Sequence, residues 1–307
     1  MAVMKADLHV IELEGVAKRY GAVEAVRDVS FGLPQGARVA LVGHNGAGKT
    51  TLMKLMLGLI RPSAGSLRVL GEDPAAGVAG VRQRLGWLPE NVSFNPALTG
   101  REVLRFFARL KGERAAAADE LLARVGLAEA ARRRVGGYSK GMRQRLGLAQ
   151  AMLGHPRALL LDEPTTGLDP AVRQGLYEML ATLAGGGTTV LLSSHALEEL
   201  EGRVERVVIL DHGRVVADGN MTELRQLAML PVRLRLTLAA EAVPDWVDGQ
   251  ARRIGPRLFE LSCLQEDKMT LLRRAAGDPR VADLEVLQPT LDELYGHFLR
   301  NRAGRGE

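Results

Sequence analysis

The sequence predicts an α/β fold with a mainly parallel sheet, followed by a small C-terminal α+β domain. Short, continuous apolar runs at 38–43, 159–162 and 188–193 are typical of strands that are covered on both faces. Segments of helical periodicity separate these runs, and alternating strands and helices indicate a parallel sheet. Near Pro231 the pattern changes to alternation of apolar and polar residues, which marks a second domain.

The first domain, expected at 1–230, begins with two predicted strands. Residues 8–15 and 23–33 mix alternation with β-branched residues. A helix is expected at 49–60, because the apolar residues there recur at helical spacing. A Leu-, Ala- and Arg-rich stretch predicts a helical lobe at about 97–153. Another helix is expected between the last two apolar runs.

The second domain, expected at 231–307, has a different character. Apolar residues alternate with polar ones at 232–238, as in a half-buried strand. Another strand is expected at 257–264 and a helix at 268–276. A final helix follows Pro289, where Thr290 and Glu293 form a capping box. We expect an accessory or regulatory domain here.

Composition excludes several classes of protein. The chain has 307 residues, 46% of them apolar, enough for two domains with sizeable cores. Only 4% are aromatic and the net charge of +5 is spread along the chain, so no nucleic-acid partner is expected. One cysteine excludes an internal disulfide, and the six histidines show no ligand spacing. No signal peptide or membrane span is predicted, which indicates a cytoplasmic protein.

The segment GHNGAGKT at 43–50 has the pattern of a phosphate-binding loop (P-loop). Gly46 and Gly48 let the backbone curl so that its N–H groups point at phosphate oxygens. Lys49 adds positive charge and Thr50 supplies a hydroxyl for Mg²⁺. A plain glycine turn is the alternative, but the predicted strand before the segment and the helix after it favour a nucleotide site.

Two adjacent acids end a buried strand in LLLDEP at 159–164. Asp162 is suited to hold Mg²⁺ through water, and Glu163 to act as the general base on an attacking water. His195, in LLSSHALEE, follows the next strand and is expected near the same edge of the sheet. A lone histidine is more often a cap or a core residue, so its role depends on the motifs around it.

The order of GHNGAGKT, YSKGMRQR, LLLDEPTTGLDP and SSHALEE resembles that of the ATP-binding subunits of ABC transporters. The resemblance covers at least residues 8–220 and implies a P-loop NTPase fold with a helical signature lobe. YSKGMRQR, at 138–145, is the discriminating element, since P-loops occur in many NTPases.

This resemblance implies ATP and Mg²⁺ as cofactors, with adenine stacked on Tyr20. Glu163, His195 and Glu90 are the implied catalytic residues, and Thr50, Glu90 and Asp162 the implied Mg²⁺ residues. The residues expected to bind the nucleotide are Tyr20, Gly43, Asn45, Gly46, Ala47, Gly48, Lys49, Thr50, Thr51, Ser139, Gly141, Asp162 and Asp169. Glu90 stands where much of the family has Gln, and Lys140 and Met142 also depart from the common signature.

Only one set of these motifs is present, so the resemblance implies a head-to-tail homodimer in which the signature of one copy faces the P-loop of the other. It also implies an integral-membrane permease that holds the chain on the cytoplasmic face of the inner membrane. An apolar stretch after Glu90, with Phe94 and Leu98, suits a helix-in-groove contact with that permease. Alternatively, Phe94 packs beneath its own loop.

A finer resemblance concerns 88–112 and the signature helix. These segments are similar to the NosF-type ATPase subunits of copper-processing ABC systems for nitrous-oxide reductase maturation, which implies copper or sulfur handling by partner subunits and a periplasmic partner. The alternatives are an ATPase of another drug- or ion-export system, a soluble ABC-type ATPase acting on nucleic acid or ribosomes, and a binding-only regulatory subunit.

Overall fold

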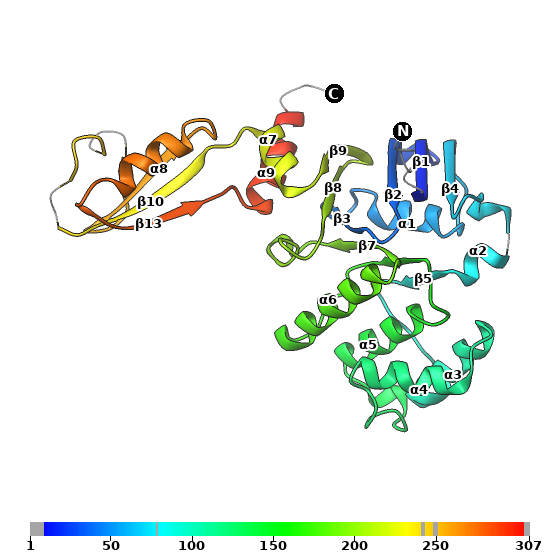
Figure 1. Cartoon of the computed structure of the whole chain (residues 1–307). Coiled ribbons are helices and arrows are strands. Elements are labelled where there is room, and N and C mark those ends of the chain that lie inside the picture. The colour runs from blue at the N-terminus through cyan, green and yellow to red at the C-terminus, as the bar shows by residue number, and fades with distance from the viewer. Residues whose placement is uncertain (1–8, 78, 241–242, 248–250, 304–307) are drawn as a thin grey trace, which may run out of the picture. The chain divides into compact units, whose positions relative to one another are not determined.

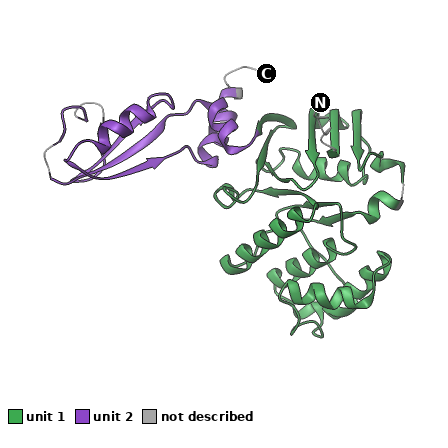
Figure 2. Cartoon of the chain, viewed as in Figure 1, with its two compact units in different colours: residues 1–218 green, residues 219–307 purple. Residues whose placement is uncertain are grey.

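The computed structural model describes residues 9–77, 79–240, 243–247 and 251–303. The stretch at 1–8, for which no signal peptide was predicted, lies outside the described residues. The chain divides into two compact units, residues 1–218 and 219–307 (Figure 2). Among the described helices, none is long and apolar enough to cross a membrane.

The first unit contains nine strands and six α-helices among its described residues (Figure 1). The strands are β1 (His9–Tyr20), β2 (Val23–Pro34), β3 (Arg38–Val42), β4 (Ala64–Val69), β5 (Leu85–Leu88), β6 (Ala158–Leu161), β7 (Thr189–Ser194), β8 (Arg206–Asp211) and β9 (Arg214–Gly219). The helices are α1 (Lys49–Met56), α2 (Ala79–Gln83), α3 (Gly100–Leu110), α4 (Ala115–Arg124), α5 (Lys140–Ala151) and α6 (Pro170–Gly185), with short 3₁₀ turns at Pro74–Ala76, Val135–Gly137 and Leu197–Glu199.

The main sheet has the strand order β5-β6-β7-β3-β8-β9, and its pairs from β5 to β8 are parallel. The predicted mainly parallel sheet is therefore confirmed. Leu41 of β3 pairs with Ser193 of β7, and Leu161 of β6 pairs with Leu192. This register brings the carboxyl ends of β3, β6 and β7 to one edge of the sheet. A second, antiparallel sheet has the order β2-β1-β4.

Helices α3, α4 and α5 contact one another and form the helical lobe (Figure 1). Thr99 and Glu102 close a capping box at the start of α3. Gly112 and Gly126 have φ values of 75° and 68° just after α3 and α4, so each helix ends in a left-handed residue that glycine adopts without strain. Gly58, with a φ of 64°, likewise ends α1 before the predicted residue 60.

The second unit is a small α+β body. Its elements are α7 (Met221–Ala228), β10 (Val232–Leu238), β11 (Ala251–Arg253), β12 (Leu258–Cys263), α8 (Lys268–Ala276), β13 (Val281–Leu287) and α9 (Leu291–Ala303). The strands form an antiparallel sheet of order β11-β12-β10-β13. Along β10 the buried residues alternate with partly exposed ones, as a half-buried strand requires. Thr290 and Glu293 form the capping box predicted for α9.

The division between the units lies at 218/219, whereas the predicted boundary lies at 230/231. The difference is α7, which packs against α9 and so belongs with the second unit. The role of the second unit as an accessory or regulatory domain stays a prediction.

Gly86 in β5 is a sensitive point of the scaffold that carries the site. A Cβ at Gly86 would lie 2.1 Å from the Ala151 carbonyl oxygen and 2.4 Å from a Leu159 methyl group. We expect Gly86→Ala to lower the free energy of unfolding by about 3 kcal/mol or more, at the upper end for overpacked cores.

The matched control is Gly80→Ala in α2, where a Cβ meets nothing within 4 Å. It should stabilise by about 0.5–1 kcal/mol. Denaturant unfolding curves measure both, and equal effects would contradict the packing argument.

Candidate nucleotide-binding site

A cavity of about 750 Å³ lies where β3, β6 and β7 end. Most of the predicted site residues line it: Tyr20, Gly43, Asn45, Gly46, Gly48, Lys49, Thr50, Thr51, Glu90, Asp162, Glu163 and His195. Ala25, His44 and Thr166 also line it and were missed by sequence reasoning. Residues from five distant segments thus meet in one concave site, and four of these segments follow the parallel strands β3, β5, β6 and β7.

The P-loop backbone adopts the curl that its glycines allow. Gly46 and Gly48 have φ values of 86° and 108°, in the range that side chains disfavour. A Cβ at Gly48 would also lie 2.5 Å from the Ala25 carbonyl oxygen. Gly48 is the N-cap of α1, so the helix N-terminus, with its partial positive charge, begins at the cavity.

Lys49 supplies the positive charge of the site. Its Nζ donates to the carbonyl oxygens of Gly43 and, at 3.2 Å, His44. Burial lowers the pKa of Lys49, while the negative charges of Glu163, Asp162 and Glu90 act in the opposite direction. Three carboxylates around one ammonium leave an excess of negative charge in the cavity.

Asp162 joins the P-loop to the end of β6. It is 2% exposed, and its Oδ2 accepts a 2.7 Å hydrogen bond from the Thr50 hydroxyl. Its Oδ1 accepts a 2.6 Å bond from the Ser193 hydroxyl. Mg²⁺ prefers such hard oxygen ligands, and Thr50 and Asp162 already present theirs side by side. Glu90 adds a third, exposed carboxylate on the wall of the cavity. These three residues therefore fit the expected ion.

Glu163 is held in an unusual backbone conformation. Its φ is 50°, which is uncommon for a residue with a side chain and costs free energy. Its N–H donates to Ser193 Oγ at 2.9 Å, and its carbonyl oxygen accepts a 3.3 Å bond from Gln144 Nε2. Its carboxylate lies 2.6 Å from His195 Nδ1. This backbone conformation places the nearly buried carboxylate of Glu163 at the cavity, beside His195.

Sequence reasoning missed Ser193 and Gln144, whose side chains hold the two acids in place. Ser193 contacts both acids at once, and Gln144, 3% exposed, ties the signature helix α5 to the backbone of Glu163. Both are buried polar side chains with apolar neighbours in the chain, Ser193 after Leu191 and Leu192 in a buried strand and Gln144 in mid-helix. That contrast is the signal that could have found them.

Four predicted residues do not line this cavity: Ala47, Ser139, Gly141 and Asp169. Ala47 is fully buried and its N–H donates to the His44 carbonyl at 3.0 Å. Ser139 and Asp169 are exposed N-caps of α5 and α6. A Cβ on Gly141 would lie 2.9 Å from the Gly167 carbonyl oxygen, so the signature packs closely on the loop that follows Glu163.

Tyr20 lines the same cavity as the P-loop and the acids. It ends β1 before the left-handed Gly21, and 48% of it is exposed. Lys18 Nζ lies 5.2 Å from the centre of its ring, which leaves a flat aromatic surface beside a cation at the rim of the cavity. An adenine ring can stack on such a surface.

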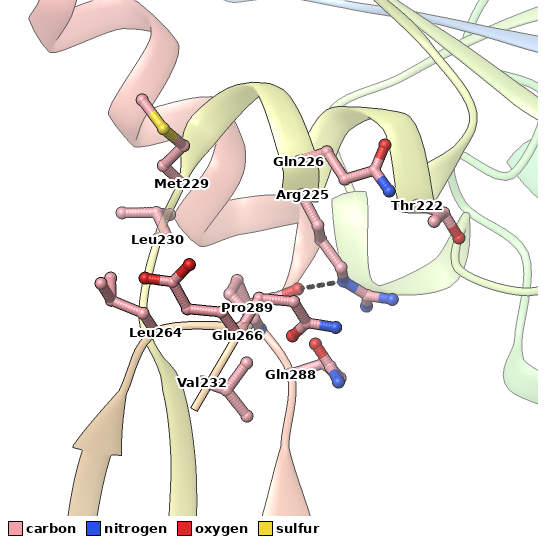
Figure 3. Close-up of a pocket in the computed structure, with 11 residues that line it drawn as sticks. Thr222, Arg225, Gln226, Met229, Leu230, Val232, Leu264, Glu266, Gln288 and Pro289 are labelled. Carbon is pink, nitrogen blue, oxygen red and sulfur yellow. Dashed lines mark hydrogen bonds between the residues drawn. The ribbon is translucent and has the colours of Figure 1, made fainter. Parts of the chain in front are cut away.

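The second unit contains a cavity of its own, of about 600 Å³ (Figure 3). Arg225 lines it and donates from Nε to the Pro289 carbonyl oxygen at 2.9 Å. Val232 and Leu264 supply apolar lining. None of the residues predicted for nucleotide binding lines this cavity.

Comparisons with known proteins agree with this geometry. A family model described as ABC transporter matches residues 26–166. A daunorubicin resistance ATP-binding protein of Streptomyces coeruleorubidus is 38% identical over 304 residues, which cover 94% of this chain and 95% of the relative. The chain belongs to the ABC transporter family.

Two further matches extend this result. A doxorubicin resistance ATP-binding protein of Mycobacterium tuberculosis is 39% identical and covers 95% of this ABC protein and 94% of the relative. A solved structure described as a dimeric bacterial ABC transporter cassette is 25% identical, with a TM-score of 0.63, and covers 69% of this chain and 98% of that chain. The predicted P-loop NTPase fold is confirmed. The chain is an ATP-binding, ATP-hydrolysing ABC transporter subunit, and ABC ATPase domains use ATP with Mg²⁺.

The Ser193 hydroxyl offers a direct test of the site. Ser193→Ala leaves the buried N–H of Glu163 without its partner, which should lower the free energy of unfolding by about 1–3 kcal/mol. It also releases Asp162, so kcat for ATP hydrolysis should fall. The matched control is Ser194→Ala, which removes a hydroxyl that accepts from the Ala196 N–H and contacts neither acid. Denaturation and steady-state ATPase assays measure both, and an equal loss of kcat in the two variants would contradict the bridging role.

Proposed function

We propose that this chain binds MgATP in the P-loop cavity and hydrolyses it with Glu163 as general base, to power a separate membrane permease that exports a drug-like organic molecule. The observation that carries the catalytic part is the placement of Glu163. Its backbone is fixed by Ser193 and Gln144, and its carboxylate meets His195 in the cavity that holds Lys49.

Each group has a chemical task in this proposal. Glu163 Oε2 accepts a proton from the attacking water while His195 orients the carboxylate or reaches the γ-phosphate. Lys49 and the N–H groups at the start of α1 offset phosphate charge. Tyr20 positions the adenine. Thr50, Asp162 and Glu90 are the residues that would hold Mg²⁺, which when bound withdraws charge from the β- and γ-phosphates.

The homodimer explains the residues that lie outside the cavity. Ser139 and the N–H of Gly141 begin an exposed helix N-terminus, a favourable place for a phosphate. The guanidinium of Arg143 donates a hydrogen bond to the Tyr138 carbonyl oxygen, so one of its donors is used within the signature itself. We infer that these donors reach ATP held by another copy, and that the exposed Asp169 faces the same interface. The dimeric cassette among the solved structures supports this arrangement.

The drug-export alternative fits the relatives better than the copper-processing hypothesis. Both relatives named above are drug-resistance ATP-binding proteins, and each matches the second unit as well as the first. Neither supports a role in nitrous-oxide reductase maturation, and neither points to the periplasmic partner that such a role implied. We therefore propose an amphipathic, daunorubicin-like molecule as the class of cargo.

The helical lobe carries an apolar surface that suits a permease helix. Phe106 and Leu110 on α3 are 48% and 62% exposed, and Leu98 is 37% exposed. Phe94 packs edge-on against Phe107 with ring centres 6.3 Å apart, which favours the packing role left open for it. We propose that this surface holds the chain at the cytoplasmic face of the inner membrane. No comparable observation supports the alternative of a soluble ATPase that acts on nucleic acid or ribosomes. The presence of Asp162 and Glu163 together in the cavity argues against a binding-only subunit.

Glu163→Gln tests the catalytic assignment. The variant should bind MgATP but lose at least about 100-fold in kcat, in the range attributed to general base catalysis. Because ligand held across an interface stabilises that interface, it should also accumulate as a dimer with MgATP. Size-exclusion chromatography and an ATPase assay measure the two effects, with the exposed Glu129→Gln as control. Turnover like that of the unmodified chain would refute the role of Glu163.

Phe106→Asp tests the partner and the cargo. We expect the unmodified chain to co-purify with an integral-membrane protein and to lower daunorubicin accumulation in cells that express both. Phe106→Asp should abolish both effects and leave MgATP binding intact, because the residue lies outside the cavity. Leu59→Asp, at a position 60% exposed outside the helical lobe, is the matched control.

The outcomes of that experiment are separable. Co-purification that survives Phe106→Asp would contradict the contact surface. Recovery of ribosomes in place of a membrane protein would favour the soluble alternative. A change in copper handling without any change in drug accumulation would restore the copper-processing hypothesis.

A further inference from the structure

His44 of the P-loop meets the consecutive residues Asp211 and His212, which lie far from it in the sequence. His44 follows β3, Asp211 ends β8, and His212 stands in the turn before β9. One ligand atom from each lies within 4.8 Å of the others. His44 Nε2 is 3.0 Å and His212 Nδ1 is 2.8 Å from the same carboxylate oxygen, Asp211 Oδ1. Sequence spacing gave no sign of this cluster, since His44 and Asp211 are separated by 167 positions.

The hydrogen bonds of His44 fix which of its ring atoms carries a proton. Its Nδ1 lies 2.7 Å from the Asn45 carbonyl oxygen, which can only accept, so Nδ1 is the protonated nitrogen. In a neutral ring Nε2 then presents a lone pair, and it faces a carboxylate oxygen that is also an acceptor. Two acceptors 3.0 Å apart require either a proton on one of them or a metal ion between them.

Three features favour a metal ion. Two imidazole nitrogens and a carboxylate are a ligand set that zinc accepts, with water in the fourth position. The bond from His44 Nδ1 to a backbone carbonyl is the outer contact that metal-bound histidines usually make. The Asp211 side chain is only 10% exposed, whereas those of His44 and His212 are 38% and 70% exposed, so an ion can enter from solvent and keep a water.

We propose that His44, Asp211 and His212 bind a divalent transition-metal ion, of which Zn²⁺ is the type. Zinc binds nitrogen and oxygen atoms at roughly 2.0–2.2 Å, and the side chain of His212, 70% exposed, has room to adjust to an ion between the three ligand atoms. The neighbouring Lys49 donates to the backbone carbonyl oxygen of His44 at 3.2 Å. The His44 imidazole faces Asp211 and not Lys49.

The location gives the ion a defined effect. The turn that contains His212 already pairs with the P-loop, since Gly213 N–H donates to the Ala47 carbonyl at 2.9 Å. The Gly213 carbonyl accepts from Arg27 N–H at 2.7 Å. A metal ion would add a second link from this turn to His44, which itself lines the nucleotide cavity. The metal would thereby brace the P-loop without contacting the acids that carry out hydrolysis.

Zn²⁺ binding by the full chain is the test, measured without nucleotide after chelator treatment. A chromophoric chelator serves as competitor, and Co²⁺ absorption reports the coordination geometry. His212→Asn removes one ligand, and asparagine tolerates the left-handed backbone at this residue, whose φ is 44°. The matched control is His155→Asn, because His155 is also exposed and has a φ of 46°.

We expect one Zn²⁺ per unmodified chain and an affinity at least about ten-fold lower in His212→Asn, the smallest effect usual for altered metal sites. His155→Asn should bind like the unmodified chain. Equal Zn²⁺ affinity in the two variants would overturn the proposal, as would the absence of Zn²⁺ binding by the unmodified chain, which would leave a proton in place of the metal ion. These readouts do not depend on ATP hydrolysis, so they remain valid if the proposed export function fails.

Discussion

The parallel pairing of β6, β7 and β3 is the constraint on which the site depends. Because Leu41 pairs with Ser193 and Leu161 with Leu192, the three strands reach their carboxyl ends together. The P-loop, the acid pair and His195 all follow directly from those ends. A slip of one residue would turn alternate side chains to the other face and remove Ser193 from between the acids. Strand register is thus the first requirement for the chemistry, ahead of any single catalytic residue.

A second requirement is that Glu163 be held against its own backbone preference. The positive φ costs free energy, and the hydrogen bonds that Glu163 donates to Ser193 and accepts from Gln144 offset that cost. Gln144 belongs to α5, the helix that begins with the signature residues. Any movement of the signature therefore bears on the backbone of the proposed base. This short path gives a physical connection between the surface where another copy would bind and the position of the carboxylate.

The sequence predicted those parts of the molecule that depend on local chemistry. The P-loop could be identified because its glycines, Lys49 and Thr50 are contiguous and their tasks are set by the nearby backbone. The covered strands and the capping box of Thr290 and Glu293 follow from equally local rules.

Contacts made by folding escaped prediction. Ser193 and Asp162 are 31 positions apart, and only the register of β6 and β7 makes them neighbours. The His44–Asp211–His212 cluster arises in the same way. Strand β8 lies outside the predicted strands although residues 207–210 form an apolar run, and β13 has a mostly exposed pattern that periodicity does not reveal. The position of α7 depends on its packing against α9, which no pattern in α7 encodes.

The position of Ser139, Gly141 and Asp169 outside the nucleotide cavity has a consequence for mixtures of active and damaged copies. In the proposed dimer each copy lends its signature to the other, so a chain with a damaged signature impairs the site on its intact partner. The share of fully competent dimers then falls as the square of the active fraction, faster than the share of good chains. Damage at the signature would therefore be genetically dominant, even though each copy folds and binds its own nucleotide.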